Sequence, residues 1–165
     1  DWALADFHQH GRVATLQNLR TTKTEELEAQ LLEFSKTKKV WLILPSLYSE
    51  LEGDALPAIR DKLAEIPYID HIVIGLDNAT ESQFESAKAF FSDLPQDHSI
   101  LWNDGPRLKT IDEQLAAGTL APREIGKGRN VWYCFGYTLA CGRADEVALH
   151  DCDILTYSRA KLARL

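Results

Sequence analysis

A short apolar run that ends in two aspartates, EVALHDCDI at residues 146–154, organises the fold that we predict for this chain. An apolar run of this length predicts a buried strand, which delivers the residues after it to the carboxyl edge of a sheet. Open α/β proteins bind their ligands at that edge. Because side chains alternate between the two faces of a strand, we expect Asp151 and Asp153 to point to the same side.

Two carboxylates placed in this way suit a divalent metal. Mg²⁺ and Mn²⁺ prefer oxygen ligands and usually bind through one or two carboxylates together with the phosphates of a substrate. The motif therefore predicts a metal-bound diphosphate, with Asp153 and Asp151 as the metal-binding residues. Aspartates in this spacing also solvate turns or cap helices, so the rest of the chain has to decide between the two interpretations.

Three further strands are predicted upstream of this segment. Residues 40–44 form a continuous apolar run closed by Pro45, residues 71–76 form a second strand and residues 99–102 a short third one. Stretches with helical periodicity separate these strands, which indicates βαβ crossovers. We therefore expect an α/β, Rossmann-like fold with a mostly parallel sheet flanked by helices.

The predicted helices carry their apolar residues at helical spacing: Leu27, Leu31 and Phe34; Leu56, Ile59 and Leu63; Phe84, Ala87 and Phe91; Leu108, Ile111 and Leu115; and Val131, Phe135 and Leu139, on one face of the last helix. Capping boxes are expected at Thr22 with Glu25 and at Thr80 with Gln83. Gly142 is expected to end the last helix.

The amino-acid composition limits the classes of protein to which this chain can belong. The chain has 165 residues, of which 45% are hydrophobic, as is usual for one globular core. A net charge of -7 without a block of basic residues argues against nucleic-acid binding. No apolar run approaches the ~20 residues that span a bilayer, and no signal peptide is evident, so we expect a cytoplasmic protein without a membrane span.

The three cysteines, Cys134, Cys141 and Cys152, show no C-x-x-C pairing, which indicates buried thiols in a reducing compartment. We expect an N-terminal extension with one helix over residues 1–38 and a nucleotide-sugar-binding α/β domain over residues 39–165. The chain lacks methionine and ends in an amphipathic pattern without a stop signal. We therefore predict the amino-terminal part of a longer enzyme, and the sequence leaves a homodimer open.

Polar groups gather where the predicted strands end. Ser46 and Glu50 follow the first strand and Asp77 follows the second. Because the carboxyl ends of parallel strands meet at one edge, these groups can line the same crevice as the two aspartates. Lys127, between two glycines at a helix start, offers a cation and backbone N–H groups to a phosphate. The segment lacks the full P-loop signature, which excludes a P-loop.

The order of these motifs resembles the nucleotide-sugar-binding half of GT-A glycosyltransferases, most closely the group of glucosyl-3-phosphoglycerate and mannosylglycerate synthases. LPSLYSE at residues 44–50 resembles that group's LPALNEE loop, and Asp77 stands where its second strand ends in an acidic nucleoside contact. Residues 126–128 resemble its G-K-G helix start, and residues 151–153 match its D-x-D motif. The resemblance covers roughly residues 40–160.

The resemblance implies donor-binding roles for Pro45, Ser46, Leu47 and Glu50 at the nucleoside and ribose, Asp77 at the base, Lys127 at the diphosphate or base, and Asp151 at the ribose or a metal-bound water. It implies that Asp153 binds Mg²⁺ or Mn²⁺ directly. Tyr48 and Ser49 replace the Asn-Glu of the group, so Glu50 is expected to serve for the ribose contact. The acceptor loop and the histidine that completes the metal shell are expected beyond Leu165.

The resemblance implies a metal-dependent hexosyltransferase that moves a sugar from UDP-glucose or GDP-mannose to a small acidic acceptor such as 3-phosphoglycerate. It does not identify a catalytic residue. Two alternatives from other classes stay open. One is a non-catalytic nucleotide-binding or regulatory domain. The other is a Mg²⁺-dependent phosphohydrolase of the haloacid dehalogenase kind, although Thr156 falls one residue late for the D-x-D-x-[TV] pattern of that class.

Overall fold

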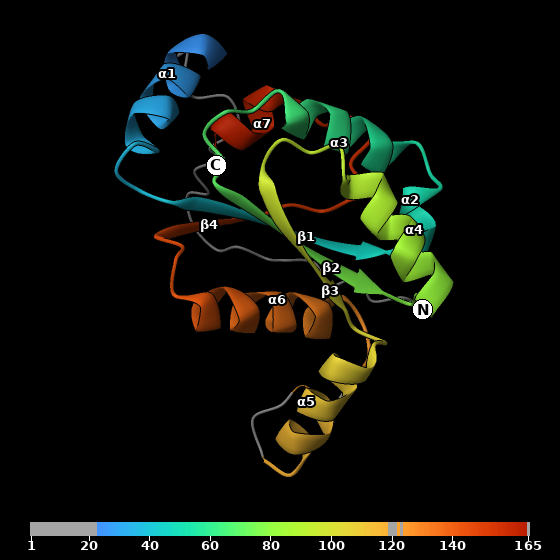
Figure 1. Cartoon of the computed structure of the whole chain (residues 1–165). Coiled ribbons are helices and arrows are strands. Elements are labelled where there is room, and N and C mark those ends of the chain that lie inside the picture. Colours follow the sequence, from blue (N-terminus) through green and yellow to red (C-terminus); the bar gives the residue numbers. More distant parts are fainter. Residues whose placement is uncertain (1–22, 119–121, 123, 165) are drawn as a thin grey trace, which may run out of the picture.

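The computed structural model describes residues 23–118, 122 and 124–164, and this part of the chain forms one four-stranded sheet (Figure 1). The strands are β1 (Val40–Leu47), β2 (His71–Asp77), β3 (Asp97–Trp102) and β4 (Glu146–Leu149). They lie in the order β3-β2-β1-β4, and all neighbouring strands are parallel. The predicted α/β fold with a parallel sheet is confirmed.

Helices cover both faces of this sheet. They are α1 (Thr24–Phe34), α2 (Tyr48–Leu51), α3 (Ala55–Ala64), α4 (Glu81–Phe91), α5 (Pro106–Ala116), α6 (Lys127–Cys141) and α7 (Arg159–Ala163). In Figure 1, α3, α4 and α7 lie on one side of the sheet, and α5 and α6 lie on the other. None of the helices in the described ranges is long and apolar enough to cross a membrane.

The two central strands are buried on both faces, which explains their continuous apolar sequence. Leu42 and Ile72 point into the core beneath α3, whereas Trp41, Ile43 and Val73 form a second cluster on the α6 side. Each strand therefore contributes side chains to both layers, as strands in parallel sheets do. This arrangement fixes the register of β1 and β2 and hence the position of the residues that follow them.

Among residues 23–118, 122 and 124–164, β4 lies at an edge of the sheet, a position that the sequence did not predict. In the described part of the chain it pairs only with β1, and Val147 and Leu149 are 38% and 40% exposed. The expectation of a buried strand is wrong because a short apolar run does not distinguish a central strand from an edge strand. Asp151 and Asp153 lie in the turn after β4, so strand alternation does not set their directions.

β1 continues through Pro45 instead of ending there. Pro45 pairs with Gly75 of β2. A proline is tolerated at this central position because β4 ends early on the other side of β1, where Ile43 O accepts a hydrogen bond from His150 N at 3.1 Å. The loop expected over residues 45–50 is therefore the end of β1 followed by the single turn of α2.

α6 packs on the sheet through a different face from its apolar stripe. Its buried side chains are those of Asn130, Tyr133, Cys134 and Thr138. Of the predicted stripe, Phe135 is 38% and Leu139 79% exposed. The physical reason lies at Gly75, where an added Cβ would be 1.8 Å from Asn130 Oδ1. Helix and strand approach so closely that short polar side chains fill the contact, and Asn130 Nδ2 donates to Gly75 O at 2.8 Å.

Two of the predicted helix ends are confirmed. Thr80 accepts a hydrogen bond from Gln83 N at 3.3 Å, while Gln83 Oε1 accepts from Thr80 N at 2.8 Å, which completes the capping box of α4. Gly142 ends α6 in the left-handed conformation, with φ 60°. α1 begins at Thr24 without a side-chain cap, and Thr22, the expected cap, lies outside the described residues.

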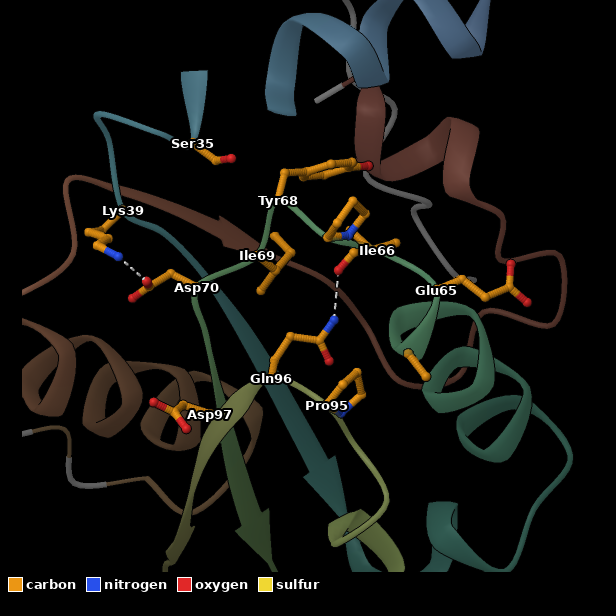
Figure 2. A pocket seen from close by; sticks show the side chains of 12 residues that line it. Ser35, Lys39, Glu65, Ile66, Tyr68, Ile69, Asp70, Pro95, Gln96 and Asp97 are labelled. Atoms are coloured by element: carbon orange, nitrogen blue, oxygen red, sulfur yellow. Dashed lines mark hydrogen bonds and ion pairs between the residues drawn. The ribbon is translucent and has the colours of Figure 1, made fainter. Parts of the chain in front are cut away.

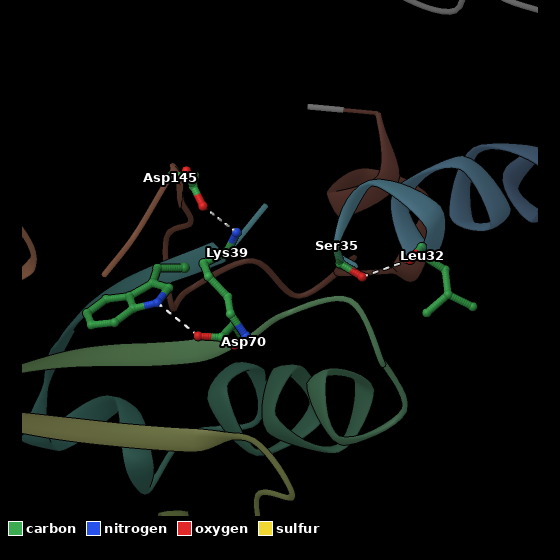
Figure 3. A network of polar contacts seen from close by, with 6 residues as sticks. Leu32, Ser35, Lys39, Asp70 and Asp145 are labelled. Carbon is green, nitrogen blue, oxygen red and sulfur yellow. Dashed lines mark hydrogen bonds and ion pairs between the residues drawn. The ribbon is translucent and has the colours of Figure 1, made fainter. Parts of the chain in front are cut away.

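Charged contacts tie together the amino ends of three strands (Figure 3). Lys39 Nζ forms an ion pair with Asp70, which also accepts a hydrogen bond from Trp41 Nε1 at 3.2 Å. Asp145 accepts from the backbone N of Lys39 at 2.8 Å and from Lys38 Nζ at 3.1 Å. We call Lys38, Lys39, Trp41, Asp70 and Asp145 the amino-edge network; it joins the starts of β1, β2 and β4.

Candidate functional site

The carboxyl edge of the sheet brings together charged side chains from three separate segments. Lys127, the first residue of α6, forms an ion pair with Asp151 in the turn after β4, and Nζ and Oδ1 are 2.5 Å apart. This hydrogen bond, and then the negative charges of Asp151, Asp153 and Glu50, raise the pKa of Lys127. We call Glu50, Lys127, Asp151 and Asp153 the carboxyl-edge cluster.

Glycine positions the lysine of this cluster. Gly126 has φ 150°, a conformation that side chains disfavour, and its carbonyl accepts the first hydrogen bond of α6 from Asn130 N at 3.1 Å. The free N–H groups at the start of a helix and the positive end of its dipole favour an anion there. The side chain of Lys127 is 57% exposed, so it can pair with a ligand as well as with Asp151.

The end of β1 and the turn of α2 form the neighbouring part of the edge. Glu50 accepts a hydrogen bond from Leu47 N at 2.8 Å, which holds its carboxylate against the backbone. Ser46 is 2% exposed, and its hydroxyl donates to Leu47 O at 2.9 Å. Pro45 is buried as well, whereas Leu47 is exposed. A ligand at this position therefore meets the side chains of Leu47 and Glu50.

Asp77 ends β2 beside Leu47, its partner in the sheet register, but outside the carboxyl-edge cluster. Its side chain is 5% exposed, and Oδ1 accepts a hydrogen bond from Asn78 N at 3.1 Å. Asn78 has φ 57°, which an asparagine tolerates in a tight turn. One carboxylate oxygen of Asp77 is thus hydrogen-bonded within the turn that follows β2.

Asn103 is a polar residue of this edge that sequence reasoning missed. It follows β3 and donates its backbone N–H to Leu76 O at 2.9 Å, which places it beside the end of β2. Its amide is 6% exposed, and neither Oδ1 nor Nδ2 has a hydrogen-bond partner within the described part of the protein. The sequence did not single out Asn103 because it begins the turn segment Asn-Asp-Gly-Pro, and the side chains of such segments usually bond to their own backbone.

The donor set at the edge fits a divalent metal only in part. Asp151 and Asp153 supply carboxylate oxygens, which Mg²⁺ and Mn²⁺ prefer. Among the residues that the structure describes, no group of three His, Cys, Asp or Glu side chains could hold a metal ion. Two carboxylates suit a metal that takes its remaining ligands from water and a diphosphate, and such a metal would compete with Lys127 for Asp151.

Cys152, between the two aspartates, points inward. It is 2% exposed and lies beside Ser46, and burial raises the pKa of its thiol. Cys134 is buried on the α6 side of the sheet, and Cys141 is partly exposed. All three cysteines are free, so burial is confirmed for two of the three predicted thiols.

A pocket of about 690 Å³ lies at the opposite edge, among residues that precede β1, β2 and β3 (Figure 2). Figure 2 shows Tyr68, Asp70 and Gln96 around it. Gln96 Nε2 donates to Leu63 O at 2.7 Å and to Ile66 O at 2.8 Å, so its amide satisfies two backbone carbonyls in the wall of the pocket. None of the predicted site residues lines this pocket, and ligands of open α/β sheets bind at the other edge.

Comparison with known proteins gives relatives in sequence, although no family model matches the chain. The chain is 44% identical over 162 residues to a glucosyl-3-phosphoglycerate synthase from Persephonella marina, which is 98% of this chain and 40% of that protein. It is 33% identical over 154 residues to a glucosyl-3-phosphoglycerate synthase from Methanococcoides burtonii, which is 93% of this chain and 37% of that protein. The chain thus spans about 40% of the length of these relatives.

A solved structure shares the fold. The crystal structure of glucosyl-3-phosphoglycerate synthase from Mycobacterium tuberculosis in complex with Mn²⁺, uridine diphosphate and glucosyl-3-phosphoglycerate aligns with 87% of this chain and 42% of that chain. The TM-score is 0.50 and the sequence identity 18%. At this identity the likeness supports the architecture of the sheet and its helices, and no residue role is transferred from it.

Proposed function

We propose that this chain, a relative of the glucosyl-3-phosphoglycerate synthases, is the donor-binding part of a GT-A hexosyltransferase. The complete enzyme would move a hexosyl group from a nucleoside-diphosphate sugar to a small acidic acceptor such as 3-phosphoglycerate. The sequence identity to two synthases of that name supports this reaction class over a phosphohydrolase or a purely regulatory domain.

The observation that carries the proposal is the carboxyl-edge cluster. Residues from α2, the start of α6 and the turn after β4 meet within electrostatic reach of one amine, although they are far apart in sequence. A cation beside several carboxylates suits a ligand that has both negative charge and a bound metal, which a nucleoside diphosphate provides.

In this proposal the cluster rearranges when the donor binds. Lys127 Nζ leaves Asp151 and pairs with the diphosphate, which frees Asp151 for the ribose or a metal-bound water. Asp153, which is exposed, would hold Mg²⁺ or Mn²⁺ through its carboxylate. When bound, the metal supplies Lewis-acid stabilisation of the charge that builds on the departing nucleoside diphosphate.

The nucleoside would lie along the ends of β1 and β2. Leu47 would form the surface on which it rests, and the buried residues Pro45 and Ser46 would shape the backbone beneath it rather than meet the ligand. Glu50 is oriented by its bond to Leu47 N and can accept a hydrogen bond from a ribose hydroxyl. Asp77 would read the base with the oxygen that the turn leaves free.

For the donor we propose UDP-glucose rather than GDP-mannose, because the similar Mycobacterium tuberculosis enzyme was solved with UDP and Mn²⁺. For the acceptor we propose a phosphorylated glycerate, because the relatives are synthases of glucosyl-3-phosphoglycerate. A cytoplasmic location and a homodimer stay predictions.

Calorimetric titration tests the proposal. The chain is titrated with UDP, UDP-glucose, GDP and GDP-mannose, each with and without Mn²⁺, as wild type, Asp153→Ala and the matched control Asp97→Ala. Asp97 is an exposed aspartate at the start of β3, on the edge away from the cluster. We expect Mn²⁺-dependent binding of the uridine nucleotides, weakened at least about tenfold in Asp153→Ala and unchanged in the control.

Binding that does not depend on Mn²⁺, or that Asp97→Ala weakens as much as Asp153→Ala, would contradict the metal role of Asp153. A folded chain that binds none of the four nucleotides would contradict the donor site itself.

A further inference from the structure

The side chain of Asn103 is a buried amide at the edge of the sheet where the proposed donor site lies. The residue is 6% exposed, and neither its Oδ1 nor its Nδ2 has a hydrogen-bond partner among residues 23–118, 122 and 124–164. Folded proteins pair nearly all such groups, so a buried amide with both ends unpaired requires a specific explanation. A ligand that supplies the missing partners is such an explanation.

The backbone places Asn103 beside Asp77. Leu76 and Trp102 are partners in the register of β2 and β3, and Asn103 N donates to Leu76 O at 2.9 Å, so the ladder continues past the end of β3. Asp77 and Asn103 are therefore the next neighbours across the two strands. Because neighbouring strands lie about 4.8 Å apart, one small ligand can contact both side chains.

The side chains of Asp77 and Asn103 lie on the α6 face of the sheet. Leu76 belongs to the apolar cluster beneath α4, and Trp102 packs against it. Side chains alternate between the two faces of a strand, so the next residue of each segment turns to the opposite face. Gly75, two residues before Asp77, faces α6 as this alternation requires. A ligand beside both residues would thus lie on the face that carries α6.

These two side chains together offer an acceptor next to a donor. The carboxylate oxygen of Asp77 that does not bond to Asn78 N can only accept, whereas Asn103 Nδ2 can donate. This pair matches a base that presents a ring N–H beside a carbonyl oxygen, as uracil does at N3 and O4 and guanine at N1 and O6. Cytosine presents the reverse, an unprotonated ring nitrogen beside an amino group.

We infer that Asn103 selects the base of the nucleotide donor. Its amide turns towards the base, and Nδ2 donates to the carbonyl oxygen at position 4 of uracil while Asp77 accepts from N3–H. Because the amide has no partner within the described residues, this rotation breaks no hydrogen bond there. The inference rests on the proposed function and adds to it a residue that distinguishes uracil from cytosine. Asn103 reads the pair of groups rather than the size of the base, since guanine carries the same pair.

Calorimetric titration with UDP and CDP, both in the presence of Mn²⁺, tests this inference, because the two nucleotides differ only at N3 and position 4 of the base. Inorganic pyrophosphate with Mn²⁺ serves as a ligand without a base. The variants are Asn103→Leu, which removes both polar atoms, and Asn103→Asp, which replaces the donor by an acceptor. Gln114→Leu is the matched control, since it removes an exposed amide from α5.

We expect the wild type to bind UDP about tenfold or more tightly than CDP, because cytosine turns an acceptor towards the carboxylate of Asp77. Both Asn103 variants should weaken UDP about fivefold or more and CDP by less, so the ratio of the two affinities falls. The ratio should fall furthest in Asn103→Asp, whose carboxylate repels O4 of uracil and accepts from the amino group of cytosine. Affinity for pyrophosphate, and every affinity of Gln114→Leu, should stay at the wild-type value.

A ratio of UDP to CDP affinity that neither Asn103 variant changes would overturn the inference. An equal loss of UDP, CDP and pyrophosphate would overturn it as well, because it would make Asn103 a structural residue; urea unfolding confirms that each variant is folded. A wild type that binds no UDP would overturn the donor site and this inference together, whereas UDP binding that is the same in wild type and variants would count only against the role of Asn103.

Discussion

At the amino edge of the sheet, Asp70 and Asp145 each contact a lysine amine and an indole or backbone N–H, whereas at the carboxyl edge three carboxylates lie around the amine of Lys127. Both edges combine carboxylates with lysine amines. Their ratio of acid to base differs, and so does their exposure, because Asp153 is exposed and has no hydrogen-bond or ion-pair partner within the described residues.

We interpret this difference as one between charged groups that stabilise the fold and charged groups that bind a ligand. A carboxylate that caps a strand start and bonds to a neighbouring strand stabilises the native chain. Several carboxylates around one amine repel one another and add little to stability, so their position is better explained by a ligand that carries positive charge. Four substitutions sharpen or break this distinction.

The largest effect is expected at the packing contact that supports the carboxyl edge. Gly75→Ala places a methyl group 1.8 Å from Asn130 Oδ1 and 2.6 Å from Cys134 Sγ, so α6 has to move off β2. We expect the free energy of unfolding in urea to fall by about 3 kcal/mol. Gly136→Ala, in the same helix but with no atom within 4 Å, should instead raise stability by about 0.5–1 kcal/mol.

Equal stability of Gly75→Ala and wild type would mean that α6 can shift freely, which would remove the support that we assign to Lys127. Nucleotide affinity measured on the same variant would then report how much of the site depends on the placement of α6.

The second effect tests the structural role of the amino-edge network. Asp70→Ala leaves the indole N–H of Trp41 without its acceptor in a fully buried ring, so we expect a loss of about 1–2 kcal/mol in urea unfolding. Glu33→Ala, which removes a surface ion pair with Lys36, should cost less than about 0.5 kcal/mol.

A double-mutant cycle with Trp41→Phe decides which partner of Asp70 matters. If the indole is the reason, the cost of Asp70→Ala becomes smaller in the Trp41→Phe background. An unchanged cost would assign the effect to Lys39.

The third effect concerns pH at the amino edge. Burial, and then the charge of Arg143, lower the pKa of His71, which stacks on Trp41 and bonds to Ser99 Oγ at 2.9 Å. The unfolded chain therefore binds more protons than the folded chain between the folded pKa and 6.5. Stability from this group is complete above pH 6.5 and is lost as the pH falls towards the folded pKa.

His71→Gln keeps a hydrogen-bonding group for Ser99 but cannot titrate. We expect the wild type to exceed this variant in stability by more at pH of about 7.5 than at pH of about 5.5, measured by urea unfolding. A difference that stays constant over this range would show that His71 does not contribute to acid sensitivity.

The smallest effect on stability is expected at the carboxyl edge. Asp153→Asn should change the free energy of unfolding by no more than about 0.5 kcal/mol, because the carboxylate is exposed and its neighbours Asp151 and Glu50 carry the same charge. The same variant should lose Mn²⁺-dependent nucleotide binding. A destabilisation as large as that of Asp70→Ala would make Asp153 a structural residue and remove the contrast between the two edges.

Much of the fold follows from local sequence. The apolar runs of β1 and β2, the helix stripe of Leu56, Ile59 and Leu63, and the capping box at Thr80 all depend on residues close to one another in the chain, and all appear in the structure. Helical and strand periods are properties of neighbouring residues, which is why they can be recognised without a structure.

The parts that could not be predicted depend on contacts between distant residues. The edge position of β4 depends on which strands pair, and the buried face of α6 depends on the missing Cβ of Gly75, 55 residues before Asn130. The unpaired groups of Asn103 and His150 also follow from the packing around them rather than from their sequence neighbours.

For the candidate site, the sequence by itself determined which residues follow the strands: Ser46 and Glu50, Asp77, and the pair Asp151 and Asp153, with Lys127 at a glycine-flanked helix start. Only the tertiary structure decided that Lys127 pairs with Asp151, that Asp77 Oδ1 accepts a hydrogen bond within the turn after β2 and that His150 lines a pocket. The physical reason is that periodicity fixes a residue's place along an element, whereas distances between elements are set by how closely their side chains allow them to pack.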